Sequence, residues 1–141
     1  MLIRDILGTK SPDIHAIYPD EPISVAIDKM VKLDIGSLIV MQGGRMAGLV
    51  TLREILRGIN RYGREITDMH ISEIMCTNPV IGAPDSTVEY VRAVMTDNHV
   101  SHLPVLEGDK LVGVISLHDV ARACLNEAEY ENTMLKRYIA M

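Results

Sequence analysis

Two stretches of this chain repeat each other: PDEPISVAIDKMVKLDIGSLIVMQGGRMAGLVTLREILR, residues 19–57, and PDSTVEYVRAVMTDNHVSHLPVLEGDKLVGVISLHDVAR, residues 84–122. A constant offset of 65 positions (84 − 19 = 65) superimposes them without a gap. The identical pairs begin with Pro19 and Pro84 and end with Arg57 and Arg122. Such an internal repeat indicates two copies of one small unit, each too small to bury a core alone. We expect the two copies to pack face to face, with a cleft between them as the place to look for function.

Each repeat predicts an extended segment, a helix, two strands joined by a tight turn, and a second helix. In the first repeat we expect an extended segment over 14–18, a helix beginning at Pro22, strands over 37–41 and 45–50, and a helix over about 51–59. In the second, Ser86 and Glu89 predict a capping box, followed by strands over 102–106 and 110–115 and a helix from Ser116 past Leu125. The predicted fold is therefore α+β, with two pseudo-symmetric βαββα repeats packed through their sheets.

The expected boundaries are a first repeat over 1–60, a polar linker over 61–70, a second repeat over 71–126 and a helical tail over 127–141. Apolar side chains recur at helical spacing in the tail: Met134, Leu135, Tyr138 and Ile139. This periodicity predicts a buried face without telling what buries it. The tail helix either docks on its own domain or forms a dimer contact.

Composition excludes several classes of protein. The chain has 141 residues and a net charge of −5, which argues against a nucleic-acid-binding surface, because such a surface needs a basic patch. No stretch approaches the roughly 20 apolar residues that span a membrane, and the first residues do not form a signal peptide. Cys76 and Cys124 have no CxxC spacing, which favours partly buried thiols in a cytoplasmic protein.

One motif closes the second strand of each repeat: Gly48-Leu49-Val50-Thr51-Leu52-Arg53-Glu54 and Gly113-Val114-Ile115-Ser116-Leu117-His118-Asp119. In both, a hydroxyl side chain at the start of a helix precedes a carboxylate by three positions. This spacing is that of a capping box, which satisfies free N–H groups at a helix start. The same groups also suit a nucleoside phosphate, because a helix N-terminus favours phosphate and a carboxylate can accept hydrogen bonds from a ribose diol. Both interpretations stay open at this point.

The chain resembles a tandem pair of cystathionine-beta-synthase (CBS) domains, a Bateman module, over almost its whole length. The resemblance rests on the motifs at residues 113–120, 102–105, 78–81 and 84–85, and on their first-half counterparts at 48–55 and 37–40. Each motif is weak alone, but their order and fixed spacing are specific. The family implies a stand-alone regulatory module rather than an enzyme.

The resemblance also implies a ligand and its contacts. Such pairs typically bind adenine nucleotides, such as AMP, ADP, ATP or sometimes NAD, or S-adenosylmethionine, in the cleft between the repeats. Asp119 would hold the ribose hydroxyls and Ser116 the phosphate, while an adenine pocket would be lined by Val80, His102, Leu103 and Pro104. In the first repeat Thr51 and Glu54 would take the equivalent places, with His15, Ile17 and Ser37 nearby.

The sequence departs from the family pattern at two positions. Ile39 stands where the second repeat has Pro104, and Ser101 stands where relatives often carry an arginine that could bind phosphate. Lys10 either supplies the missing positive charge or is a solvated lysine, as most lysines are.

Other functions are weaker hypotheses. His99 and His102 lack the further ligands of a zinc site, so we expect no metal. No nucleophile has an evident base, and no phosphate-binding glycine loop is present. We expect an adenine-nucleotide sensor that forms a homodimer and acts on an unknown effector protein, without nucleic-acid or membrane partners. The alternatives are a ligand-free structural or dimerisation module and an enzyme acting on nucleotides.

Overall fold

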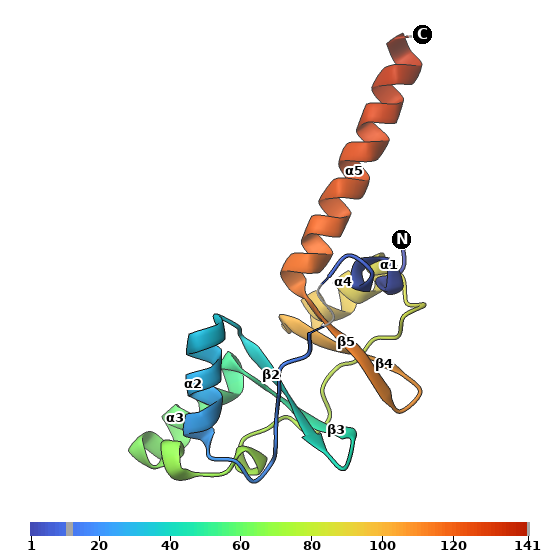
Figure 1. The fold of residues 1–141 in the computed structure, drawn as a ribbon. Helices are drawn as coiled ribbons and strands as arrows, with labels where there is room; N and C mark the ends of the chain where they lie inside the picture. The colour runs from blue at the N-terminus through green and yellow to red at the C-terminus, as the bar shows by residue number, and fades with distance from the viewer. Residues whose placement is uncertain (11–12, 141) are drawn as a thin grey trace. The chain divides into compact units, whose positions relative to one another are not determined.

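The computed structural model describes residues 1–10 and 13–140, which divide into two compact units (Figure 1). Unit 1 contains residues 1–10, 80–105 and 114–140. Unit 2 contains residues 13–79 together with the hairpin residues 106–113.

Unit 2 carries the first repeat. Its elements are β1 (Ala16–Ile17), α2 (Ile23–Leu33), β2 (Ser37–Gln42), β3 (Arg45–Thr51) and α3 (Leu52–Tyr62), followed by the 3₁₀ turns η1 (Gly63–Asp68) and η2 (Ile71–Glu73). The sheet order is β1-β2-β3, with β1 parallel to β2 and β2 antiparallel to β3. Gly43 and Gly44 form the β2–β3 turn at positive φ, a conformation that glycine adopts without strain. The predicted helices and strands are confirmed. β2 and β3 each end one residue later than expected, and β1 ends one residue earlier than the extended segment expected over 14–18.

The core of unit 2 is aliphatic because the chain has no Trp and no Phe. One side of α2 buries Ile23, Ala26 and Met30 beside Leu38 and Val40 of β2. Val31, which follows Met30 on the same helix, is exposed. Successive helical residues differ by about 100° in direction, so the neighbour of a central core residue already faces outward.

Unit 1 carries the second repeat. Its elements are α1 (Ile3–Leu7), α4 (Val88–Asp97), β4 (His102–Glu107), β5 (Lys110–Ser116) and α5 (Leu117–Ala140), and β4 pairs with β5. In place of a strand like β1, Gly82 forms a single parallel bridge with Val105. This bridge is the counterpart of the β1–β2 pair Ile17–Val40, because both positions are shifted by 65 (17 + 65 = 82 and 40 + 65 = 105).

The segment that opens each repeat packs on the other repeat. α1 precedes the first repeat, yet Ile3 donates its backbone N–H to the Ser86 carbonyl at 2.9 Å, within unit 1. η2 precedes the second repeat, yet Ile71 donates to the Glu21 carbonyl at 3.0 Å, within unit 2. The region expected to be a linker also contributes to unit 2, since Ile66 of η1 is buried in its core. The repeats are therefore contiguous in sequence but exchange their first turns in space.

The cap of α4 differs from the sequence expectation. Thr87, not Ser86, is the N-cap, and its hydroxyl accepts a hydrogen bond from the Tyr90 N–H at 3.1 Å. The Ser86 hydroxyl accepts instead from the Ala83 N–H at 3.1 Å, in the preceding turn. The prediction of a Ser86–Glu89 capping box is wrong because Ser and Thr are adjacent, and the spacing could not choose between them.

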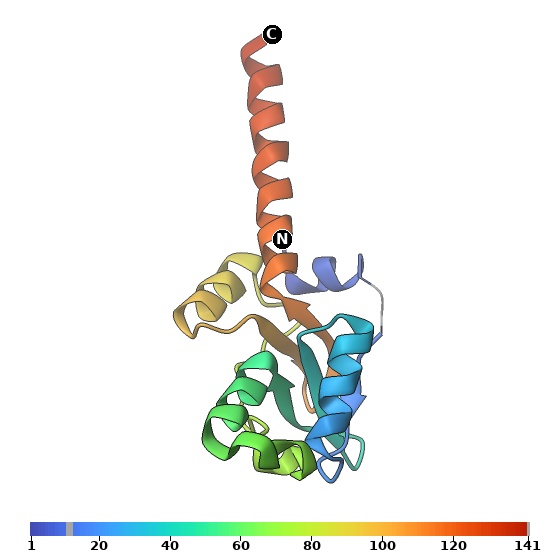
Figure 2. The same ribbon diagram turned by 90° about the vertical axis from the view of Figure 1, so that its left-hand side faces the viewer.

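The tail is not a separate element, because α5 continues without interruption from Leu117 to Ala140. α1 and α4 flank only the beginning of α5 in both views (Figures 1 and 2). All residues from 128 to 140 are exposed, so the tail does not dock on its own domain. Within the described residues, no helix, α5 included, combines the length and the apolar character needed to cross a lipid bilayer.

Candidate functional site

The hydroxyl and the carboxylate of the second repeat meet where β5 ends and α5 begins. The Ser116 N–H donates to Asp119 Oδ2 at 2.9 Å, and the Asp119 N–H donates to Ser116 Oγ at 3.0 Å. The first N–H of the helix, from Leu117, donates to the Ser101 carbonyl at 2.8 Å. These contacts are those of a capping box, so the capping interpretation of the motif is confirmed as geometry. They leave Asp119 Oδ1 without a hydrogen bond from the described residues.

Lys10 reaches this helix start from the N-terminal segment of the same unit. Its Nζ lies 2.5 Å from Asp119 Oδ2 and donates to the Val114 carbonyl at 2.8 Å. The side chains of the pair are 32% and 15% exposed. The interpretation of Lys10 as a solvated lysine is therefore wrong, because its ammonium group is held by a carboxylate and by a carbonyl of β5. The helix start thus carries a hydroxyl, a carboxylate and a fixed positive charge.

These contacts set the charge of the site. Burial alone would raise the pKa of Asp119, but the hydrogen bonds from Lys10 and Ser116 outweigh it and lower the pKa of that carboxyl. Burial and the nearby Lys10 lower the pKa of His102, against a smaller opposing effect of Asp119. At neutral pH the carboxylate is ionised and the imidazole is neutral. A neutral imidazole can accept a hydrogen bond as well as donate one.

The positions expected to line an adenine pocket lie on β4 and on the segment beside it. Leu103 and Pro104 are buried, while His102 and Val80 are half-buried. The Pro104 carbonyl accepts from the Gly82 N–H at 2.9 Å, which ties the segment after Val80 to β4. Because the side chain of Leu103 lies in the core, half-buried His102 and Val80 are the better candidates for contact with a ligand.

The first repeat builds a related but different helix start in unit 2. The Thr51 N–H and hydroxyl both donate to Glu54 Oε1, at 2.8 and 2.7 Å. The Thr51 hydroxyl also accepts from the Arg53 N–H at 3.2 Å. Among the described residues, no lysine forms an ion pair with Glu54. This helix start therefore has the hydroxyl and the carboxylate but no counterpart of Lys10.

The remaining first-repeat candidates lie close to this motif along the sheet. Ser37 of β2 is the register partner of Thr51. The His15 carbonyl accepts from the Ile39 N–H at 3.0 Å, and the side chain of His15 is exposed. Ile17 is fully buried in the core of unit 2, which leaves only its backbone to face a ligand.

Two features of these surroundings had no signal in the sequence. The Val114 carbonyl that holds Lys10 is a backbone atom, so residue type could not reveal it. A hollow of about 270 Å³ runs along α3, where Glu54 lies beside Arg57 and Arg61. The two arginines are spaced i, i+4, which predicts a shared helix face but no particular ligand.

Within the described residues, no group of three or more His, Cys, Asp or Glu side chains could hold a metal ion.

Known proteins resemble the chain in sequence and in fold. The family model of the CBS domain matches residues 3–61 and 71–126. The CBS domain-containing protein CBSX3, mitochondrial, of Arabidopsis thaliana is 32% identical over 97% of this chain and 71% of its own length. A putative signal-transduction protein with CBS domains from Burkholderia ambifaria is 29% identical over 89% of this chain and 95% of its own, with a TM-score of 0.84. The CBS domain pair of protein MJ0100, solved with 5′-methylthioadenosine and S-adenosyl-L-methionine, is 25% identical over 90% and 98% of the two chains, with a TM-score of 0.77.

Proposed function

The chain belongs to the CBS domain family, with two copies of the domain in tandem, and from this premise we propose that it is a regulatory module that binds an adenine nucleotide without turning it over. The proposed ligand is AMP, ATP or NAD. Binding shifts a conformational equilibrium, and its effect is limited by the difference in affinity between the two states.

The start of α5 is the observation that carries the proposal. Ser116 offers a hydroxyl beside the N-terminus of a helix, where phosphate is favoured. Lys10 adds a positive charge 2.5 Å from Asp119. Asp119 is ionised and keeps Oδ1 available to the hydroxyls of a ribose. A hydroxyl, a cation and a carboxylate around one helix start match a nucleoside phosphate better than an apolar ligand or a metal ion.

A solved relative supports the choice of an adenosine-containing ligand. The CBS domain pair of MJ0100 was crystallised with two such molecules, 5′-methylthioadenosine and S-adenosyl-L-methionine. Neither carries a phosphate, so this likeness supports adenosine recognition, whereas Lys10 is the feature of this chain that favours a phosphorylated form.

The two repeats should differ in affinity. The Asp119 site has Lys10 bound directly to the carboxylate at the helix start. Near Glu54, Arg57 and Arg61 lie about one and two turns further along α3 rather than at the helix start. We therefore place the tighter phosphate-bearing ligand at Asp119.

A ligand-free structural module is the second candidate, and the completed capping box at Ser116 and Asp119 favours it. Thermal unfolding with AMP, ATP, NAD and S-adenosylmethionine separates the two. A ligand at 100 times its Kd stabilises the folded chain by roughly 2.7 kcal/mol, whereas a structural cap predicts no shift. The matched control is 2′,3′-dideoxy-AMP, which keeps base and phosphate but lacks the diol. The absence of a shift with every adenosine compound contradicts the proposal.

Catalysis is tested in the same samples. Incubation with ATP or NAD, followed by chromatography of the nucleotides, should return them unchanged. Product that accumulates in proportion to protein concentration would identify an enzyme acting on nucleotides instead.

We also propose that the module is a homodimer that acts on a separate effector protein in the cytoplasm. α3 supports the dimer because Leu52, Leu56 and Ile59 are exposed along one side of that helix. Sedimentation equilibrium of the full chain measures the oligomeric state, and a monomer at micromolar concentration would contradict this part of the proposal.

A further inference from the structure

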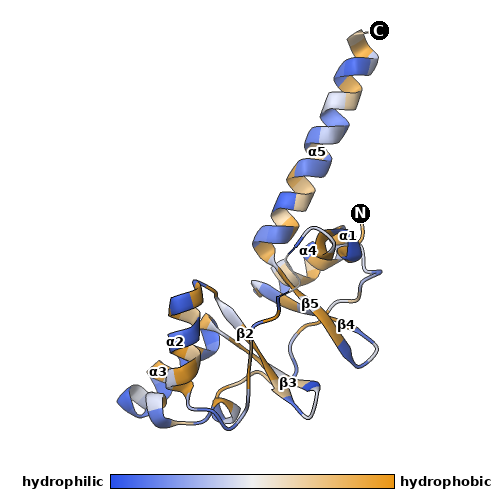
Figure 3. Cartoon of the chain, in the orientation of Figure 1, coloured by the Kyte–Doolittle hydropathy of each residue, from blue (hydrophilic) through white to orange (hydrophobic). Residues whose placement is uncertain are grey.

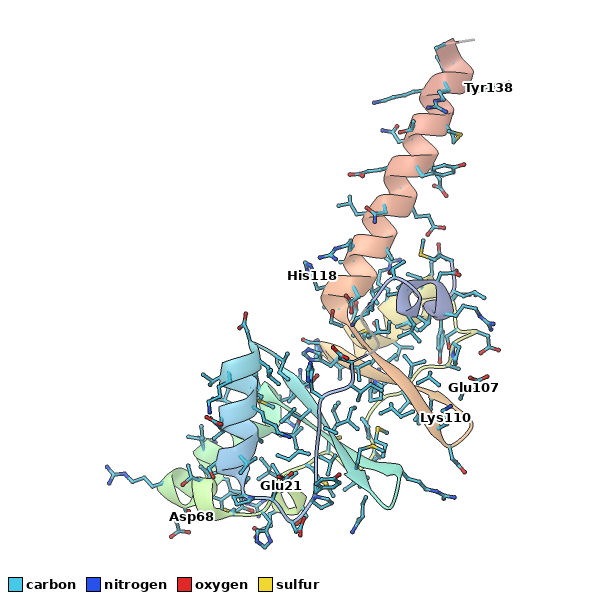
Figure 4. The ribbon with its side chains drawn as sticks, viewed as in Figure 1. Glu21, Asp68, Glu107, Lys110, His118 and Tyr138 are labelled. Carbon is cyan, nitrogen blue, oxygen red and sulfur yellow. The ribbon has the colours of Figure 1, made fainter. Side chains whose placement is uncertain are left out.

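The far part of α5 is a helix without tertiary support. Glu127 is the last half-buried residue, and its Oε1 lies 3.8 Å from the amino group of Met1. Every residue from 128 to 140 is exposed. Figure 4 labels His118 at the first turn of α5 and Tyr138 near its far end, beyond α1 and α4 of the same unit.

A helix of this length is only marginally stable in water by itself. Isolated helices shorter than about 12–15 residues gain too few hydrogen bonds to offset the cost of nucleation. The exposed stretch also carries large apolar side chains: Leu125 is 59% exposed, Leu135 57% and Ile139 74%. Figure 3 shows orange apolar bands between blue polar ones along α5. A partner that covers this side would gain apolar burial and fix the helix.

A heptad pattern runs through Leu125, Ala128, Leu135 and Ile139, whereas Met134 and Tyr138 of the expected stripe fall at its c and g positions. With Leu125 at position a, the a positions continue at Asn132 and Ile139, and the d positions are Ala128 and Leu135. Alternating steps of three and four residues place these side chains on one seam with a period of about 3.5 residues. The positions that flank this seam include Glu131 at g and Lys136 at e.

We propose that the α5 tails of two copies of this chain pair in parallel through this seam and form a short coiled coil. Asn132 determines the direction. In a parallel pair the a positions face each other, so each Asn132 amide bonds the same amide of the second copy. In an antiparallel pair an a position faces a d position, and the Asn132 amide would lie against Ala128 or Leu135 without a hydrogen-bond partner.

The charges that flank the seam agree with this direction. In a parallel pair the g position of one helix lies beside the next e position of the other, which places Glu131 near Lys136 of the second copy, twice by symmetry. The tail is thus complementary to a second copy of itself. The pairing uses other residues than the exposed apolar side of α3, and it does not depend on nucleotide binding.

Disulfide cross-linking tests the pairing and its direction. In the full chain with Cys76 and Cys124 replaced by serine, Ile139→Cys should form a cross-linked dimer under mild oxidation, because two a positions face each other. Arg137→Cys is the matched control, since position f points away from the seam, and it should stay largely monomeric on a non-reducing gel. No cross-link at Ile139→Cys, or equal cross-linking at both positions, overturns the proposal.

A charge exchange tests the flanking pair by a second readout. Lys136→Glu should lower the rate at which Ile139→Cys forms its disulfide under the same mild oxidation by about tenfold, because two attractive pairs become repulsive. Adding Glu131→Lys to Lys136→Glu should restore it. A single variant without effect, or a double variant that fails to recover, contradicts parallel pairing. Nucleotide affinity should be the same in all of these variants.

Discussion

Lys10→Met removes the ammonium group that joins the N-terminal segment to the start of α5. In the native chain this group donates to the Asp119 carboxylate and to the Val114 carbonyl. A hydrogen bond to a charged group contributes about 1.5–3 kcal/mol, and partial exposure of the pair to water reduces this figure. We expect Lys10→Met to lower the free energy of unfolding by about 1–2 kcal/mol at neutral pH.

The pH dependence of this loss is the sharper part of the prediction. The pKa of Asp119 is lowered in the folded chain, so its contribution is complete above the unfolded value of about 3.9 and disappears as pH falls through the folded pKa. The difference between the native chain and Lys10→Met should therefore be largest near pH 7, should narrow as His102 titrates because the variant relieves the lowering of that pKa, and should shrink further below about pH 4.

Urea unfolding followed by far-UV circular dichroism measures both quantities, because the chain has no Trp for fluorescence. Lys29→Met is the matched control. Lys29 also donates to a carbonyl, that of Ala16 at 2.9 Å, but it does not form an ion pair with a carboxylate of the described residues. Its cost should not change with pH in the acid range. If Lys10→Met costs nothing at neutral pH, or costs as much in acid as at neutral pH, the ion pair does not stabilise the fold.

Three further predictions follow from the same contacts. In Lys10→Met the pKa of His102 should rise, because one cause of its lowering is removed. NMR titration of the imidazole carbons measures this pKa, and an unchanged midpoint would contradict the prediction. Asp119→Asn should weaken nucleotide binding by about 1.5 kcal/mol, roughly tenfold, in isothermal titration, and an unchanged affinity with reduced stability would assign the carboxylate to capping alone. Gly82→Ala should lower the free energy of unfolding by about 1–3 kcal/mol, because the added Cβ would lie 2.6 Å from a leucine methyl of the core. Gly8→Ala is the control and should be near neutral, because its Cβ meets only backbone oxygens at 3.5 Å or more. Equal melting temperatures of the two variants would refute this prediction.

Most of the fold could be predicted from the repeat. The second copy repeats the helix-strand-strand-helix order of the first, with a single bridge in place of β1, and the strand and helix boundaries agree with the structure to within a few residues. What failed were choices between neighbours, such as Ser86 against Thr87 as the cap of α4. Capping depends on which backbone conformation the chain adopts at each position, and adjacent hydroxyl residues do not encode that difference.

The candidate site, like the fold, could be predicted from the sequence only in part. The motif residues Ser116 and Asp119 could be assigned by spacing because they contact each other within one turn of helix. The contact of Lys10 with Asp119 could not be predicted from spacing, because 109 positions of sequence separate the two residues. The sequence predicted a charge without a partner, and only the packing of residues 1–10 against the second repeat supplies one.

The order and spacing of residues by themselves determined that this chain has two like halves, that each ends a strand in a hydroxyl and a carboxylate, and that its core is aliphatic. These properties are local or periodic, so they follow from residue type at short separation. Tertiary structure alone decided that the opening turn of each half packs on the other, that Lys10 pairs with Asp119, and that the far part of α5 is exposed. Such contacts join distant segments, and their existence depends on the free energy of the whole packed chain rather than on any one stretch of it.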